Sequence, residues 1–224
     1  MPWRVSTLMT QNTFIYPQNP MKEVEKKARV PQHRYDEIKR RMTDIYGLPE
    51  HIVAEDTYYA MPPTDEESKN RFRIRKNYGG SPLRLQSIVV NAKRKQTVLG
   101  NLENNVEHEF ELRDEADLRS FVEIMESFGA RLWYTKHKDK WLFVHKGEVE
   151  YHLELCTVPI QDHDEHFLEI EGVYSADTLS AIEENALQLL IDRFITGVFE
   201  QFGIEMNVET RPYRQLMGVE YPQW

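Results

Sequence analysis

Charged side chains recur at every second residue in several segments of this chain. The clearest case is the run Glu23-Val24-Glu25-Lys26-Lys27, in which Glu23, Glu25 and Lys27 share one parity. Similar alternation occurs at residues 71–75, 107–111 and 169–171. Because successive side chains of a β-strand point to opposite faces, each segment predicts a strand with one charged face. The fold must therefore accommodate several charged strand faces.

Two arrangements accommodate such faces. An antiparallel sheet with one face in water produces the same alternation, so one hypothesis is a barrel whose charges only face solvent. Solvated faces usually mix neutral polar residues with both signs of charge, whereas each segment here tends to carry one sign. Arginine occupies positions 71, 73 and 75, and glutamate occupies positions 107, 109 and 111. This grouping favours the second arrangement, in which the charged faces point inward around a closed sheet.

An inward arrangement of these groups suits phosphate chemistry. Arginine and lysine neutralise an oligophosphate through charge-assisted and bidentate hydrogen bonds. Clustered glutamates repel one another unless a cation lies between them, and their hard oxygen ligands select Mg²⁺ or Mn²⁺. Metals and basic groups together stabilise the charge that moves during phosphoryl transfer. Such an interior therefore predicts a metal-bound triphosphate as the ligand.

Three segments, at residues 32–47, 114–129 and 175–202, have the periodicity of amphipathic helices. In the second segment Asp114 is the predicted N-cap and Gly129 follows the predicted end. The third segment has a broad apolar face that includes Ile182, Leu190 and Phe199. These helices are predicted to pack against the sheet rather than to carry chemistry.

Composition excludes several classes of function. The formal net charge of −9 argues against general binding to nucleic acid or to an anionic membrane. Cys156 is the only cysteine, so neither an intramolecular disulfide nor a cysteine-based zinc site is predicted. No apolar run approaches the roughly 20 residues that span a bilayer, and residues 1–20 lack the features of a secretory signal. These features predict a cytoplasmic protein. No glycine-rich nucleotide-binding loop occurs, so side chains must hold the phosphates.

The E-x-E-x-K run at residues 23–27 resembles the opening motif of the CYTH, or triphosphate tunnel metalloenzyme, superfamily. That superfamily includes class IV adenylate cyclases, thiamine triphosphatases, inorganic triphosphatases and fungal RNA triphosphatases. Later motifs follow in the family's order: Arg71-Phe72-Arg73, Asn91-Ala92-Lys93, Glu107-His108-Glu109, Lys136 with Lys138, Glu169-Ile170-Glu171, and Tyr213 with Leu216.

The resemblance implies an α+β fold: a closed antiparallel β-barrel of about eight strands, with flanking helices, one of which can plug an end. It covers residues 21–217, which are predicted to form one CYTH-like domain. An irregular N-terminal arm at residues 1–20 and a C-terminal tail at residues 218–224 are left outside this domain.

The same resemblance implies roles for individual residues. Metal ligands would come from Glu23, Glu25, Glu169 and Glu171, with Glu107 and Glu109 binding a second metal or orienting water. The phosphates would be bound by Lys27, Arg71, Arg73, Lys93, Lys136 and Lys138. In thiamine triphosphatases a second-strand tyrosine, paired with a lysine, is proposed to activate the attacking water. Tyr58 and Tyr59, with Lys93, occupy the matching region, and strand parity decides which tyrosine points inward. Lys27 also belongs to the predicted catalytic set.

One position departs from the family pattern. Members commonly carry an aspartate metal ligand before the final glutamate strand, where this chain has Cys156 within Leu155-Cys156-Thr157-Val158. A thiol is a poor ligand for Mg²⁺. Glu154 lies two residues earlier on the same face and is the predicted replacement carboxylate. Cys156 itself is predicted to be a small buried residue.

The resulting functional hypothesis is a Mg²⁺- or Mn²⁺-dependent triphosphatase that hydrolyses inorganic triphosphate, thiamine triphosphate or a nucleoside triphosphate. A class IV adenylate cyclase, which makes cyclic AMP and pyrophosphate from ATP, is the first alternative, because both chemistries use the same strand motifs. The second alternative is a non-catalytic module that binds polyphosphate or nucleotide. The predicted partner is a small-molecule triphosphate. Related cyclases are dimeric, so the resemblance keeps a homodimer among the open oligomeric states.

Overall fold

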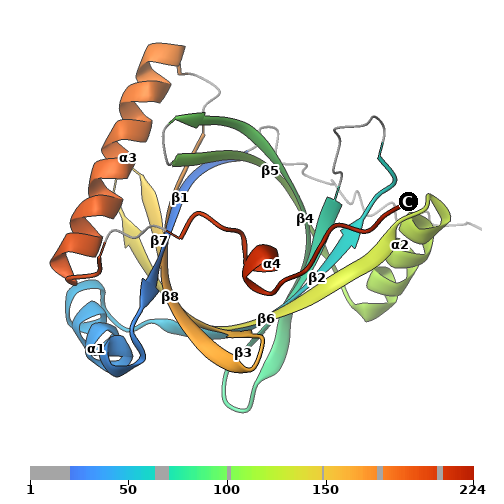
Figure 1. Ribbon diagram of the computed structural model, residues 1–224, viewed down its shortest axis with the longest axis horizontal. Helices are drawn as coiled ribbons and strands as arrows, with labels where there is room; N and C mark the ends of the chain where they lie inside the picture. The colour runs from blue at the N-terminus through green and yellow to red at the C-terminus, as the bar shows by residue number, and fades with distance from the viewer. Residues whose placement is uncertain (1–20, 64–70, 100–101, 148, 176–178, 206–208) are drawn as a thin grey trace, which may run out of the picture.

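The computed structural model describes residues 21–63, 71–99, 102–147, 149–175, 179–205 and 209–224 (Figure 1). Only the backbone is described at residues 21, 93–99, 102–107 and 175. The predicted N-terminal arm lies outside the described residues.

Eight strands occur in the described part of the chain. They are β1 (Met21–Val30), β2 (Glu50–Ala60), β3 (Arg71–Gly79), β4 (Arg84–Leu99), β5 (Leu102–Leu112), β6 (Arg131–Lys146), β7 (Glu150–Ile160) and β8 (His163–Ser175). All neighbouring strands are antiparallel, in the order β1-β5-β4-β3-β2-β6-β7-β8. Because β8 also pairs with β1, the sheet closes into a barrel (Figure 1). The prediction of an α+β fold with an eight-stranded antiparallel sheet is confirmed.

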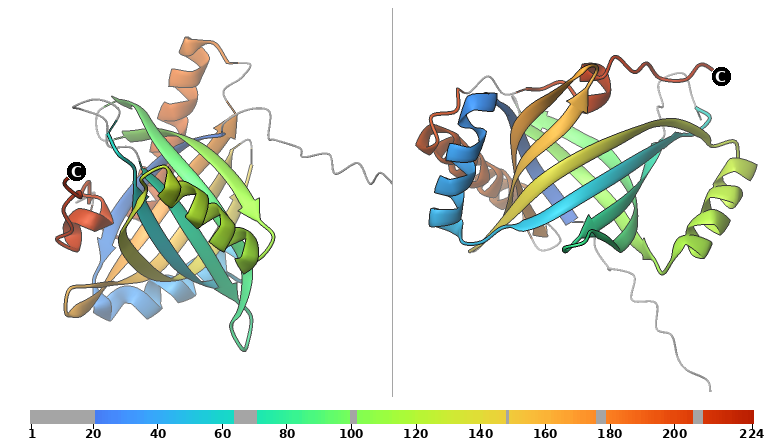
Figure 2. Two further views of the ribbon diagram at one scale, coloured as in Figure 1. Left: turned by 90° about the vertical axis from the view of Figure 1, so that its right-hand side faces the viewer. Right: turned by 90° about the horizontal axis from the view of Figure 1, so that it is seen from below.

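Helices flank this sheet. A 3₁₀ turn (Gln32–Arg34) leads into α1 (Tyr35–Tyr46), and α2 (Glu115–Ser127), α3 (Ala181–Gln201) and the short α4 (Tyr213–Leu216) follow. The helices α1 and α3 lie on one side of the barrel and α2 lies on the other (Figure 1 and Figure 2). None of the described helices is long and apolar enough to cross a membrane.

Side-chain caps mark the helix starts. The Asp114 carboxylate accepts hydrogen bonds from the backbone N–H groups of Ala116 and Asp117, as its predicted N-cap role requires. The third helix begins later than predicted, because Ser180 forms a capping box with Glu183. The prediction that Ile182 and Leu190 pack against the sheet is wrong: they are 81% and 49% exposed.

Apolar side chains on the outer face of the barrel determine which strand face points inward. Val24, Leu153 and Leu168 pack against α1 and α3 in one cluster, and Phe72 and Ile88 pack against α2 in another. Burying each such side chain stabilises the fold by about 1.5–3 kcal/mol, and a one-residue slip would turn every one of them to the other face. The charged residues of opposite parity therefore face the barrel interior.

The C-terminal segment crosses one end of the barrel. Its short α4 lies in front of the opening in the view of Figure 1. Leu216 packs there with Cys156, Val158 and Phe167 on the inner faces of β7 and β8. Further along, Trp133 Nε1 donates a hydrogen bond of 2.6 Å to the Glu220 carbonyl. The barrel interior is therefore covered at this end.

Candidate functional site

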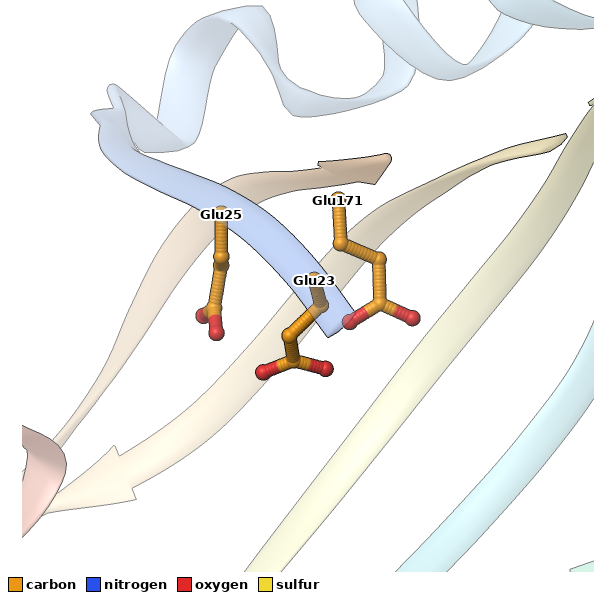
Figure 3. Close-up of side chains that lie close together, drawn as sticks. All are labelled: Glu23, Glu25 and Glu171. Atoms are coloured by element: carbon orange, nitrogen blue, oxygen red, sulfur yellow. The ribbon is translucent and has the colours of Figure 1, made fainter. Parts of the chain in front are cut away.

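Three glutamates from β1 and β8 form an acidic cluster inside the barrel (Figure 3). Glu23 and Glu25 share the inner face of β1, and Glu25 lies opposite Glu171 in the β1–β8 register. One carboxylate oxygen of each residue lies within 4.8 Å of the others. Three convergent carboxylates are the hard oxygen ligands that Mg²⁺ and Mn²⁺ prefer. The acidic cluster therefore fits a divalent cation.

A histidine holds one member of the acidic cluster in place. His152 Nδ1 donates a hydrogen bond of 2.8 Å to Glu171 Oε1, and its Nε2 donates one of 2.9 Å to Glu150 Oε1. The hydrogen bond to Glu171, with help from Glu150, raises the pKa of His152 to about 9. The imidazolium is thus charged at neutral pH and orients the Glu171 carboxylate.

A basic wall of Arg73 and Arg75 from β3 and Lys136 from β6 surrounds one buried carboxylate, Asp56 on β2. Arg75 donates two hydrogen bonds to Asp56, of 2.6 and 2.9 Å, and Lys136 Nζ lies 3.0 Å from Asp56 Oδ2. Burial alone would raise the pKa of Asp56, but Arg75, Lys136 and Arg73 hold it well below its usual range. Asp56 therefore fixes the basic wall in position.

Arg73 retains hydrogen-bonding capacity toward the interior. Its guanidinium nitrogens lie 3.9 Å from both Asp56 Oδ2 and Glu109 Oε1, beyond hydrogen-bond length. Its buried Nε has no hydrogen-bond partner in the described part of the chain. Glu109 instead accepts a hydrogen bond of 2.6 Å from Asn91 Nδ2. A buried, unpaired donor of this kind suits an anionic ligand.

The structure separates the two candidate tyrosines. The Tyr58 ring stacks on Tyr134 at 4.4 Å between centroids, beside Lys136 and Arg73. Burial would raise the pKa of Tyr58, but the positive charge of Lys136 and its neighbours lowers it overall. Tyr59 belongs to the outer core against α2 and stacks on Phe72 at 5.0 Å. Placing Tyr59 in the site is therefore wrong, because its ring packs outside the barrel.

Two predicted metal ligands contact lysine. Lys138 Nζ contacts Oε2 of both Glu154 and Glu169, and Lys140 Nζ contacts the other Glu154 oxygen. The other Glu169 oxygen accepts a hydrogen bond from the Tyr213 hydroxyl. Glu154 and Glu169 therefore lie with Lys138 rather than in the acidic cluster.

Three further residues that were predicted to bind phosphate lie on β1, β3 and β4. Lys27 Nζ donates a hydrogen bond of 2.9 Å to the Arg211 carbonyl, and burial lowers its pKa. Arg71 begins β3 with the same parity as Arg73. The backbone places Lys93 opposite Glu107 in the β4–β5 register, and their side chains lie outside the described part of the structure.

Cys156 is fully buried, as predicted. Its sulfur lies 3.7 Å from the Tyr213 hydroxyl oxygen. Burial raises the pKa of the Cys156 thiol to about 12, so the thiol is neutral at pH 7.

We expect the free energy of unfolding to fall as the pH is lowered from neutrality into the acid range. Burial raises the pKa values of Asp56, Glu154 and Glu169, but neighbouring cations more than offset it, leaving Glu169 at about 2. A depressed folded-state pKa contributes stability above the unfolded pKa of about 4, and this is lost as the pH falls toward the folded value. Urea denaturation at pH values between about 7 and 3 measures the effect. Equal stability across that range would contradict it.

Comparisons with known proteins agree with this architecture. The family described as CYTH domain matches residues 21–193. No curated protein sequence matches the chain significantly. The solved structure of the PH1819 protein from Pyrococcus horikoshii OT3 is similar, with a TM-score of 0.63 and 19% identity over 87% of this chain and 97% of that one.

Two further solved structures are similar. A candidate adenylate cyclase from Vibrio parahaemolyticus has a TM-score of 0.60 and 19% identity, over 90% of this chain and 100% of that one. A candidate adenylyl cyclase from Hippeastrum, described as having a dominant triphosphatase activity, has a TM-score of 0.57 and 13% identity. That match covers 89% of this chain and 98% of the Hippeastrum chain. At these identities the likeness shows the fold.

Proposed function

Because the chain belongs to the CYTH domain family, we propose that it is a Mg²⁺- or Mn²⁺-dependent triphosphatase whose barrel interior binds the triphosphate. The observation that carries this proposal is the placement of an acidic cluster and a basic wall inside one barrel. Carboxylates suit the cation and guanidinium groups suit the phosphate oxygens. The barrel thus offers both groups that a metal triphosphate requires.

Glu23, Glu25 and Glu171 would hold the divalent cation, and His152 would keep Glu171 oriented toward it. When bound, the cation supplies positive charge to the phosphate oxygens and polarises them. Electrostatic stabilisation of this kind is the main contribution that proteins make to phosphoryl transfer.

The basic wall would bind the phosphate groups. Arg73 has an unpaired buried donor, and Arg75 and Lys136 are held near it by Asp56. Since Asp56 is fully buried, it fixes these cations before substrate arrives, so little reorganisation is needed on binding. Asp56 acts in this proposal as a positioning residue.

Tyr58 would accept a proton from the attacking water. Its ring lies beside Lys136 and Arg73, which lower its pKa and favour the phenolate that a general base requires. Tyr134 stacks in parallel on Tyr58 and limits its rotation. The proposal therefore assigns the base to Tyr58 alone among the two candidate tyrosines.

Substitution of Arg73 tests the phosphate-binding part of the proposal. We expect Arg73→Ala to raise KM for inorganic triphosphate by about 10–100-fold, because each hydrogen bond to a charged group contributes about 1.5–3 kcal/mol. The matched control is Arg84→Ala, since Arg84 is exposed at the start of β4. Steady-state kinetics with Mg²⁺ measure both variants. An unchanged KM in Arg73→Ala would contradict phosphate binding by this residue.

A substrate panel tests the reaction itself. The purified protein is incubated with inorganic triphosphate, thiamine triphosphate and ATP, each with Mg²⁺ and with Mn²⁺, and the products are separated. Metal-dependent release of phosphate is the expected result. Cyclic AMP with pyrophosphate from ATP would establish the cyclase alternative. Tight triphosphate binding without any product would establish a binding module instead.

A further inference from the structure

Glu154 and Glu169 form a second carboxylate pair inside the barrel, apart from the acidic cluster. They lie opposite each other in the β7–β8 register. Their side chains are only 12% and 10% exposed, so bulk water solvates neither carboxylate well. Two buried carboxylates this close repel each other strongly unless a cation lies between them. The question is which cation fills that position.

In the structure the cation is Lys138. Its Nζ contacts one oxygen of Glu154 and one oxygen of Glu169 at the same time, and its side chain is 3% exposed. Burial would lower the pKa of Lys138, but Glu154 and Glu169 more than offset this and raise it well above its usual range. The ammonium group is therefore a permanent cation at neutral pH.

The remaining oxygens of the pair also have proton donors. Lys140 Nζ contacts the second Glu154 oxygen, and the Tyr213 hydroxyl donates to the second Glu169 oxygen. Each of the four carboxylate oxygens thus faces a donor. A divalent ion that bound here would have to displace Lys138 and leave a buried ammonium without its partners, which is costly.

The described side chains next to the pair, Cys156 and Tyr213, offer no anionic ligand to replace those oxygens. Cys156 is neutral at pH 7, and Tyr213 stays protonated because burial raises its pKa well above its usual range. A neutral thiol and a phenol are poor ligands for Mg²⁺ or Mn²⁺. The pair therefore does not fit a metal, in contrast to the acidic cluster.

We infer that the Lys138 ammonium takes the place of a divalent ion between Glu154 and Glu169, so that among the described carboxylates the divalent cation binds at Glu23, Glu25 and Glu171 and not at this pair. The inference rests on the proposed metal-dependent function and specifies which carboxylates hold the cation. Glu154 and Glu169 are then positioning residues for Lys138 rather than metal ligands.

Counting bound Mn²⁺ tests this inference without reference to turnover. The protein is titrated with Mn²⁺ alone, and free Mn²⁺ is measured by electron paramagnetic resonance. We expect Glu25→Gln to bind one ion per chain fewer than the wild type, and Glu154→Gln to bind as many ions as the wild type. Circular dichroism checks that each variant is folded, and the wild-type count stands even if a variant is not.

A lysine pair provides the matched comparison. Lys138→Met frees both carboxylates from the ammonium and is expected to create an additional Mn²⁺ site, raising the count by one ion per chain. Lys140→Met leaves the Lys138 bridge in place and should keep the wild-type count. An unchanged count in folded Lys138→Met would overturn the claim that the ammonium fills an ion position.

The ion counts distinguish a failure of this inference from a failure of the proposed metal-dependent function. Loss of one ion in folded Glu154→Gln would overturn the inference and leave the proposed function standing. Binding of no ion by the folded wild type would overturn the proposed metal-dependent function, and the inference with it.

Discussion

Glu25→Gln is expected to lower metal-dependent hydrolysis of triphosphate by about a thousandfold or more. A divalent cation contributes several kcal/mol of transition-state stabilisation, and each 1.36 kcal/mol is a factor of ten in rate. Glutamine keeps the shape of the side chain but removes the charge that would hold the cation in the acidic cluster. Phosphate release at saturating Mg²⁺ or Mn²⁺ measures the loss.

The control for this substitution is Glu123→Gln, because Glu123 is exposed on α2 outside the barrel. We expect its rate to match the wild type. The melting temperature of Glu25→Gln without metal should not fall, since removing one of three clustered carboxylates relieves like-charge repulsion. Undiminished hydrolysis in Glu25→Gln would mean that the acidic cluster does not hold the catalytic cation.

Tyr58→Phe is expected to lower kcat by about 10²–10⁴-fold, the usual contribution of a general base. The substitution removes only the hydroxyl and keeps the ring that stacks on Tyr134. The proposed base would work as a phenolate, so the wild-type rate should rise as the pH increases through the lowered pKa of Tyr58. The rate of Tyr58→Phe should not show this rise with pH.

Tyr59→Phe is the matched control, because Tyr59 lies next in the chain and packs in the outer core. Its kcat and pH–rate profile should stay close to those of the wild type. Equal losses in Tyr58→Phe and Tyr59→Phe would indicate a packing defect in β2 rather than a missing base.

Local patterns predicted the elements of the fold well. Period-2 alternation identified β1, β3, β5 and β8, and Asp114 before α2 and Gly129 after it marked helix boundaries. Such features depend on neighbours within a few residues, which a sequence displays directly. The predicted start of the third helix was too early. Ile182 and Leu190 of this helix are exposed, so an apolar residue in an amphipathic pattern is not always buried.

Residues whose role depends on a distant partner were harder to predict. Asp56 was missed, although Ile52, Ala54, Asp56 and Tyr58 share one parity on β2 and a lone acid among them is a usable signal. Its partners Arg75 and Lys136 come from two different strands. Only the pairing of β2 with both β3 and β6 brings them together.

Alternating charge in several strands, β1 and β8 among them, favoured an arrangement in which glutamates and basic residues share the inner face of a closed sheet, while charges facing solvent stayed an open alternative. The closed barrel determined which charged side chains lie next to each other, because its registers join strands that are far apart in the chain. The register of β1 with β8 placed Glu25 beside Glu171, while β6, β7 and β8 placed Lys138 between Glu154 and Glu169. Carboxylates with similar local patterns thus have different neighbours, since their electrostatic environment is a property of the assembled sheet.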